Sequence, residues 1–172
     1  MEKEFSHTWR TGEMIRADLD LRGPLFEKAA DVVLRKVLKA NIAALTGFIR
    51  AKVVERTPVN TGALRNSIQE EIEERDDEII GRVATNIEYA VPVEFGTKPH
   101  FPPIDPLTYW ARRKLGISGA EARSVAFRIA RKIAQRGTEG YRMFEYGLEE
   151  GEKVARKTSK ALGIEISREL GG

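Results

Sequence analysis

Apolar residues recur every three or four positions over residues 25–56, a stretch with no proline and a single glycine, Gly47. They form two adjacent rows, the first of which is Leu34, Leu38, Ile42, Leu45, Ile49 and Val53. The second row is Phe26, Ala30, Val33, Val37, Ala44 and Phe48. Two such rows are typical of a helix with one broad face in a core. We predict a helix of about 45–50 Å, which ends at Thr57-Pro58 because the residue before proline disfavours the helical region.

The chain then changes from helical to alternating patterning. A short helix is predicted over residues 62–67, with Asn60 or Thr61 as its cap. Apolar and charged residues alternate over 68–75, and a second extended run covers 79–84. The intervening Asp76-Asp77 is a turn signal, so these two runs predict a β-hairpin with one buried face. Residues 89–95 are predicted to form a third strand, at an edge because Pro92 cannot donate a ladder hydrogen bond.

The second half of the chain is predicted to be mainly helical. A proline-rich loop covers residues 96–106, and helices follow over 107–115 and 120–136, with Ser118 as a cap and Gly137 as a terminator. A last helix is predicted over 141–162, followed by a short strand at 164–166.

These elements predict the fold class and the domain organisation. Residues 1–23 are polar and are closed by Gly23-Pro24, so we interpret them as an N-terminal arm, with or without a short strand or helix. Residues 24–172 are expected to form a single α+β domain. In it, a long N-terminal helix packs on a small antiparallel β-sheet and is followed by C-terminal helices.

Composition limits the chemistry. Apolar residues make up 41% of the chain, enough for a core, and the net charge is only +3. The absence of cysteine excludes disulfides, thiolate nucleophiles and zinc–thiolate sites. No apolar run approaches the roughly 20 residues that span a bilayer, and Met1 to Arg10 lacks the hydrophobic segment of a signal peptide. We expect a folded, intracellular protein with no contact with membranes.

The sequence contains no recognisable catalytic pattern. The two histidines, His7 and His100, stand in the arm and in the proline-rich loop, away from any metal-ligand spacing. Neither a glycine-rich phosphate cradle nor a nucleophile-elbow pattern occurs. The sequence therefore predicts a protein with no catalytic, cofactor-binding or metal-binding residues, which is not an enzyme.

Opposite charges gather in two segments. The hairpin is acidic, and its candidate contact residues are Glu70, Glu71, Glu73 and Glu74. Residues 111–136 are basic, with candidate contact residues Arg112, Arg113, Arg128, Arg131 and Lys132. Opposite charges on two faces of a subunit would set the register of a head-to-tail ring contact. The alternative is a small DNA-binding protein that uses these basic helices on phosphates.

Two motifs carry a resemblance to a known family. Residues 57–68 have the sequence TPVNTGALRNSI, and residues 85–97 have the sequence TNIEYAVPVEFGT. In this order and spacing they resemble the tail-component family of long-tailed phages related to the lambdoid siphoviruses, described as neck, head–tail joining or tail-completion proteins. The resemblance covers roughly residues 30–150. Pro92 departs from the family pattern, and the N-terminal arm is not explained by it.

The resemblance implies a structural protein of a phage virion or a prophage relic, assembled in the host cytoplasm. Such a protein would be one subunit of an oligomeric ring that joins tail to head and passes DNA. Its partners would be further copies of the chain and the neighbouring head-completion and tail-tube proteins, with non-specific contact with packaged DNA and no cofactor.

Several motif residues have physical roles in the predicted fold. Pro58 ends the long helix, Gly62 allows re-entry into the short one, and Gly96 allows an abrupt turn. Glu94 lies between apolar neighbours, so it either faces solvent or needs a partner, for which Arg65 and Lys98 are candidates. The remaining residues of this set are Thr61, Tyr89 and Phe95, and the two aromatic side chains are expected in the core.

Overall fold

The computed structural model describes residues 15–20, 32–75 and 78–170. The fold is α+β, as the sequence predicts, and the chain forms two compact units. Unit 1 comprises residues 1–90 and 142–172, and unit 2 comprises residues 91–141. The predicted single domain over residues 24–172 stays a prediction, and the two units are described separately below.

The sheet of unit 1 has three antiparallel strands in the order β1-β3-β2. These are β1 (Ile15–Asp20), β2 (Gln69–Glu74) and β3 (Ile79–Thr85). The β2–β3 hairpin is confirmed, and its register sets Ile72 opposite Gly81. β1 lies within the predicted arm, so part of that arm is a strand of the sheet, while residues 1–14 lie outside the described residues.

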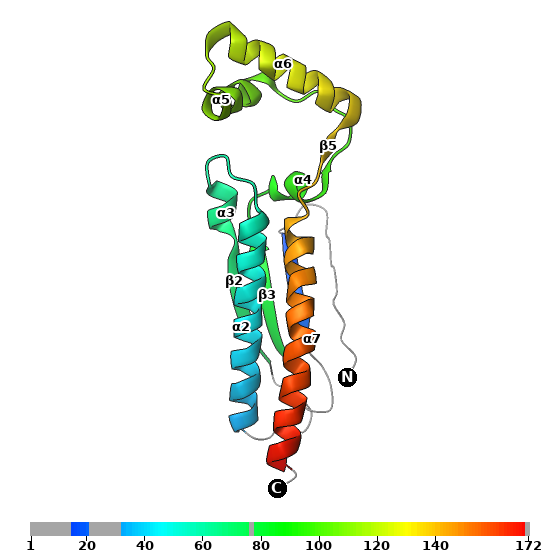
Figure 1. Ribbon diagram of the computed structural model, residues 1–172. Coiled ribbons are helices and arrows are strands. Elements are labelled where there is room, and N and C mark those ends of the chain that lie inside the picture. Colours follow the sequence, from blue (N-terminus) through cyan, green and yellow to red (C-terminus); the bar gives the residue numbers. More distant parts are fainter. Residues whose placement is uncertain (1–14, 21–31, 76–77, 171–172) are drawn as a thin grey trace. The chain divides into compact units, whose positions relative to one another are not determined.

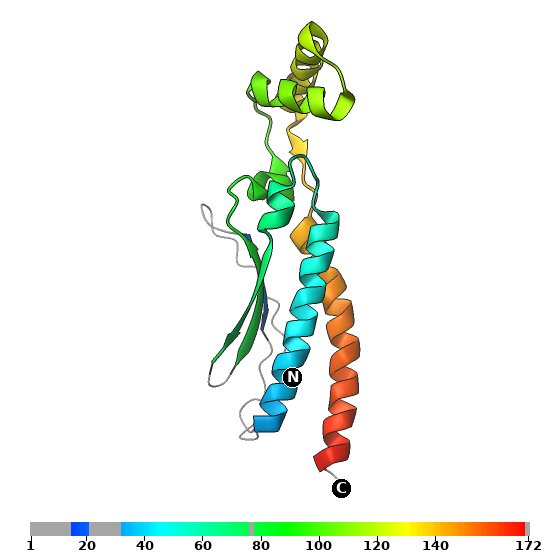
Figure 2. The same cartoon turned by 90° about the vertical axis from the view of Figure 1, so that its left-hand side faces the viewer.

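The predicted long helix is confirmed as α2 (Val32–Arg56), and residues 25–31 lie outside the described part of the chain. α2 lies between the β2–β3 hairpin and the last helix, α7 (Met143–Leu170) (Figure 2). Leu38 and Ile42 of α2 form a core cluster with Ile79 of β3, and Ile72 of β2 packs against it. The alternation along the hairpin therefore turns one face of the sheet onto the helix.

α7 runs antiparallel beside α2 (Figure 1). Gly147 and Gly151 stand one turn apart on α7, where a Cβ atom would overlap Val53 or Ile49 of α2. The absence of side chains at these two positions lets the helices approach closely. The predicted strand at 164–166 is wrong because α7 continues through it. The isoleucines there suggest a strand, yet no proline follows Met143 to break the helix.

The first motif forms the end of α2 and the short helix α3 (Ala63–Ser67), as predicted. Thr57 is buried, and its hydroxyl donates to the carbonyl of Val53 at 2.6 Å. The N-cap of α3 is Gly62 at φ 87°, and not Asn60 or Thr61 as predicted. Thr61 still contributes, because its hydroxyl accepts a hydrogen bond from the Ala63 N–H at 3.3 Å.

The second motif departs from its predicted conformation. Residues 89–95 do not form a strand, since α4 (Ala90–Phe95) is a helix. Pro92 is compatible with this helix because the N–H groups of a first turn have no intrahelical partner. The Ala90 N–H donates to the Ile87 carbonyl at 2.9 Å.

Unit 2 contains a helical hairpin, α5 (Ile104–Leu115) and α6 (Gly119–Arg136), and both helices confirm predictions. Ser118 is the N-cap of α6 and Gly137 its C-cap, also as predicted. Alanines form the buried seam between the two helices: Ala111, Ala122, Ala126 and Ala130. Small side chains allow two short helices to pack closely with little apolar volume.

Candidate assembly surfaces

The acidic strand β2 directs its carboxylates to both sides of the sheet. Glu74 lies on the α2 side, where its oxygens contact Arg35 Nη1 at 3.4 Å and Lys39 Nζ at 2.8 Å. The hydrogen bond from Lys39 is the main reason why the pKa of Glu74 lies below its ordinary value. Glu74 is therefore already neutralised within its own subunit.

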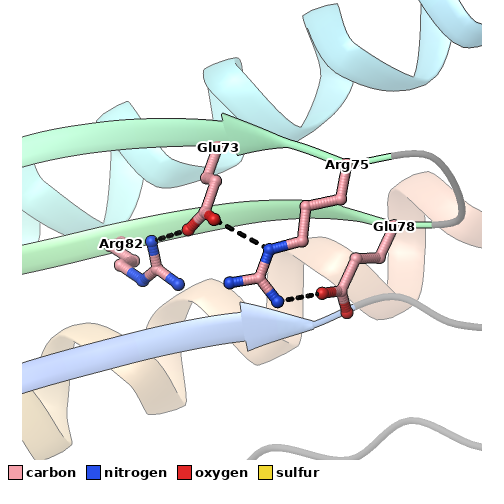
Figure 3. A network of polar contacts seen from close by, with 4 residues as sticks. All are labelled: Glu73, Arg75, Glu78 and Arg82. Atoms are coloured by element: carbon pink, nitrogen blue, oxygen red, sulfur yellow. Dashed lines mark hydrogen bonds and ion pairs between the residues drawn. The ribbon is translucent and has the colours of Figure 1, made fainter.

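Glu73 lies on the opposite side, in a network with two arginines (Figure 3). Its carboxylate accepts from Arg75 Nε at 2.7 Å and from Arg82 Nη1. Arg75 also pairs with Glu78 at 2.5 Å, which links the two strands beside the hairpin turn. The pKa of Glu73 is lowered, mainly by the hydrogen bond from Arg75 and next by the one from Arg82. The pKa of Arg75 is raised by its hydrogen bonds to Glu73 and Glu78.

Glu70 and Glu71 differ from their two neighbours. Both are exposed, and neither forms an ion pair with any described residue. Both line a groove of about 470 Å³, together with Ser67, Gln69, Arg82, Ala84, Thr85 and Asn86. Of the four candidate carboxylates on the hairpin, these two are the ones available to a partner.

Sequence patterns did not indicate that Glu73 and Glu74 would be paired. The neutralising residues are Arg35 and Lys39, one turn apart on α2, and Arg82 on the adjacent strand. The i,i+4 spacing of Arg35 and Lys39 was a visible signal that one helix face is basic. The position of this basic helix face opposite Glu74 depends on how the helix packs on the sheet, which cannot be read from the sequence.

Unit 2 carries the predicted basic surface, here called the basic hairpin and comprising residues 104–136. It contains eight Lys and Arg residues against Asp105 and Glu121. All eight are exposed, and none forms an ion pair with a carboxylate in the described ranges. They are Arg112, Arg113, Lys114, Arg123, Arg128, Arg131, Lys132 and Arg136.

Large apolar side chains are exposed on the same unit. Two of them lie beside cations: the Arg113 guanidinium is 5.7 Å from the Tyr109 ring centroid, and that of Arg123 is 5.9 Å from the Phe127 ring. Phe101 and Leu115 are also exposed. Exposed aromatic and basic side chains together are typical of surfaces that contact another macromolecule.

The residues of the second motif occupy unexpected environments. Tyr89 and Phe95 were expected in the core, but they are 49% and 51% exposed. Glu94 is instead completely buried. The helical conformation of α4 explains the reversal, because it replaces the strand alternation on which the prediction depended. Arg65 donates to the Thr57 carbonyl at 3.2 Å, and Lys98 is exposed. The pairing of either residue with Glu94 stays a prediction.

Gly96 lies where two chain segments of unit 2 meet as a ribbon. β4 (Gly96–Thr97) pairs with β5 (Thr138–Glu139), and the two threonine hydroxyls are 3.0 Å apart. Gly96 has a φ of 77°, and a Cβ there would overlap the Thr138 carbonyl. Gly96 thus has the turn-forming role predicted for it, and it also permits backbone-to-backbone packing.

Among the residues described, no group of three or more His, Asp or Glu side chains is placed to hold a metal ion. No helix within the described ranges is long and apolar enough to cross a membrane.

Comparison with known proteins gives a match to a protein family. A family model described as "Bacteriophage HK97-gp10, putative tail-component" matches residues 25–96. The matched region contains α2, α3, the hairpin and α4, and it ends at the first residue of β4. The resemblance to a tail-component family of tailed phages is therefore confirmed, and it supports a structural role in the virion. No curated protein and no solved structure matched the chain.

Proposed function

Because residues 25–96 match a phage tail-component family, we propose that the chain is a structural subunit of the head–tail junction. In this role it would be a neck, tail-terminator or tail-completion protein. Copies of the chain would form a ring that joins tail to head and passes DNA. The match over residues 25–96 carries this proposal, since it contains the first motif and nearly all of the second, in the expected order.

A ring requires that each subunit offer two different faces to its neighbours. The strand β2 provides one charged region, with the unpaired carboxylates of Glu70 and Glu71 on its two sides, and the basic hairpin provides the other. Contact between them in successive copies would set the register of the ring, while apolar groups would supply most of the affinity. Glu73 and Glu74 would contribute little because Arg82, Arg75, Arg35 and Lys39 already neutralise them.

The other partners are the neighbouring head-completion and tail-tube proteins. The proposal assigns the chain no catalytic reaction and no cofactor. This part rests on the sequence, in which no catalytic motif occurs.

A second candidate function is favoured by the unpaired cations of the basic hairpin. In that case the chain would be a small DNA-binding protein that uses residues 111–136 and has no place in the virion. The two candidates differ in where the protein is found. A DNA-binding protein would be absent from purified particles, whereas a junction subunit would be present in each one.

The experiment is to localise the protein in intact particles with a gold-labelled antibody and electron microscopy. We expect label at the junction between head and tail, with tail-tube antibodies labelling the whole tail as a control. Label at the tail tip or along the tube would contradict the junction role. Particles without label, but with a labelled tail tube, would favour the DNA-binding alternative.

A further inference from the structure

The two segments that flank the basic hairpin in the sequence lie side by side. The Tyr141 N–H donates to the Val93 carbonyl at 2.8 Å, so the segments that enter and leave unit 2 are directly hydrogen-bonded. A Cβ at Gly137 would overlap the Thr97 carbonyl, and one at Gly140 the Glu94 carbonyl. The family match ends at Gly96, where this ribbon begins. Residues 97–141 of unit 2 lie outside the matched region, so the match does not explain the surface of the basic hairpin.

Cations occupy the face of α6 that points away from α5. At about 100° per residue, Arg128, Arg131 and Lys132 fall opposite the buried seam formed by Ala122, Ala126 and Ala130. All three cations are exposed. α6 has 18 residues and so is about 27 Å long.

Folding alone does not account for these three cations. Arg136 lies in the last turn of α6, and Arg112, Arg113 and Lys114 lie in the last turn of α5, where the helix dipole favours positive charge. Arg128, Arg131 and Lys132 lie before the last turn of α6, so the helix dipole does not explain them. Arg128 and Lys132 are like charges four residues apart, a spacing that destabilises a helix. None of the three has a carboxylate partner among the described residues.

We propose that this outward face of α6 binds the phosphates of duplex DNA without reading its sequence. In this proposal the two units have different roles. Unit 1, which contains most of the matched residues, serves assembly, and unit 2 contacts DNA. DNA offers one phosphate per about 1.7 Å of its axis, which suits a row of cations along a helix. Adenine is read by an Asn or Gln side chain that makes two hydrogen bonds with the base, and Gln135 is the sole amide on α6.

A second copy of the chain fits this face less well. Among the described residues of its β2–β3 hairpin, each copy offers Glu70 and Glu71 as carboxylates without an ion pair, against eight cations on the basic hairpin. Contact with these two carboxylates would leave most of the cations to a polyanion. The inference rests on the proposed function only for the source of the DNA, which would be the genome passing through the junction.

The test measures binding of the full chain to a labelled 25-base-pair duplex by fluorescence anisotropy, from 50 to 300 mM NaCl. The variant is Arg128→Ala/Arg131→Ala/Lys132→Ala. The matched control, Lys153→Ala/Arg156→Ala/Lys157→Ala, removes the same charge from exposed positions on α7. Circular dichroism would verify that both variants are folded, and poly-L-glutamate would serve as a competitor with the chemistry of an acidic protein.

Each lost phosphate contact lowers the slope of log K against log salt by about 0.9. We therefore expect the α6 variant to lose about 3 units of slope and at least about tenfold in affinity at 50 mM NaCl, with the α7 control close to wild type. Absence of DNA binding, or equal losses in both variants, would overturn the proposal. Competition by poly-L-glutamate as strong as that by unlabelled duplex at equal charge would assign the face to an acidic protein instead. None of these results changes the location of the protein in particles, so the junction proposal is tested separately.

Discussion

Gly81 on β3 is in direct contact with Thr46 on α2, and no side chain fits between them. A Cβ at residue 81 would overlap the Thr46 hydroxyl and lie 3.3 Å from Ile42 Cγ2. Thr46 is itself buried, and its hydroxyl donates to the Ile42 carbonyl at 2.8 Å. The helix and the sheet of the matched region are thus held at a spacing that depends on this glycine.

The first prediction concerns this contact. Gly81→Ala should lower the free energy of unfolding by about 1–3 kcal/mol, the usual cost of overpacking a tight core. Gly47→Ala is the matched control, because residue 47 lies inside α2 and its new Cβ would be at an ordinary 3.5 Å from Glu70 Oε2. That variant should gain about 0.5–1 kcal/mol from helix propensity. Urea unfolding measures the free energy of unfolding of both variants. A value for Gly81→Ala equal to that of wild type would contradict the close packing.

The second prediction concerns the pairing of α2 with α7. Gly→Ala inside a helix normally stabilises it, but Gly151→Ala should destabilise the protein by about 1–3 kcal/mol because the new methyl group overlaps Ile49. Ile49→Ala removes the overlapping atoms. In a double-mutant cycle, Gly151→Ala should therefore cost less in the Ile49→Ala background than alone. Strictly additive effects would show that the two residues are not in contact.

The third prediction concerns pH. The pKa values of Glu73 and Glu74 are lowered in the folded protein, so both carboxylates contribute stability above the ordinary Glu value of 4.5. This contribution is lost as the pH falls below 4.5 through their folded pKa values. The melting temperature of Glu73→Gln/Glu74→Gln should thus depend less on pH in this window than that of wild type. Glu70→Gln/Glu71→Gln is the control, and an equal flattening in both variants would contradict the assigned ion pairs.

The fourth prediction concerns the ring contact. Glu70→Lys/Glu71→Lys should weaken oligomers, measured by native mass spectrometry or light scattering under conditions where wild type forms rings. Combining it with Arg112→Glu/Arg113→Glu on α5 should restore assembly, because the opposite charges would again face each other. Rings unaffected by any of these reversals would show that the free carboxylates and the basic hairpin do not meet.

Periodic patterns predicted the long elements well. The first apolar row on α2, the alternation of the hairpin and the caps Ser118 and Gly137 all correspond to observed elements, whereas Val37 and Ala44 of the second row are exposed. These signals arise from burial on one face and from local backbone geometry, which the sequence expresses directly.

Short elements were predicted less well. Residues 89–95 contain two valines, a tyrosine and a phenylalanine, which favour a strand, but they form α4 with Glu94 buried. A segment of this length takes its conformation from its surroundings more than from its own composition. The sequence shows in which segments acidic and basic residues gather, whereas the ion pairs of Glu73 and Glu74 depend on tertiary packing.

The central claim is that this chain joins tails to heads, and the most direct test is electron microscopy of particles made without it. Deleting the gene from an inducible phage or prophage should yield separate DNA-filled heads and separate tails. Supplying the wild-type chain should restore joined particles. Normal joined virions after deletion, or the complete loss of heads or of tails, would contradict a joining role.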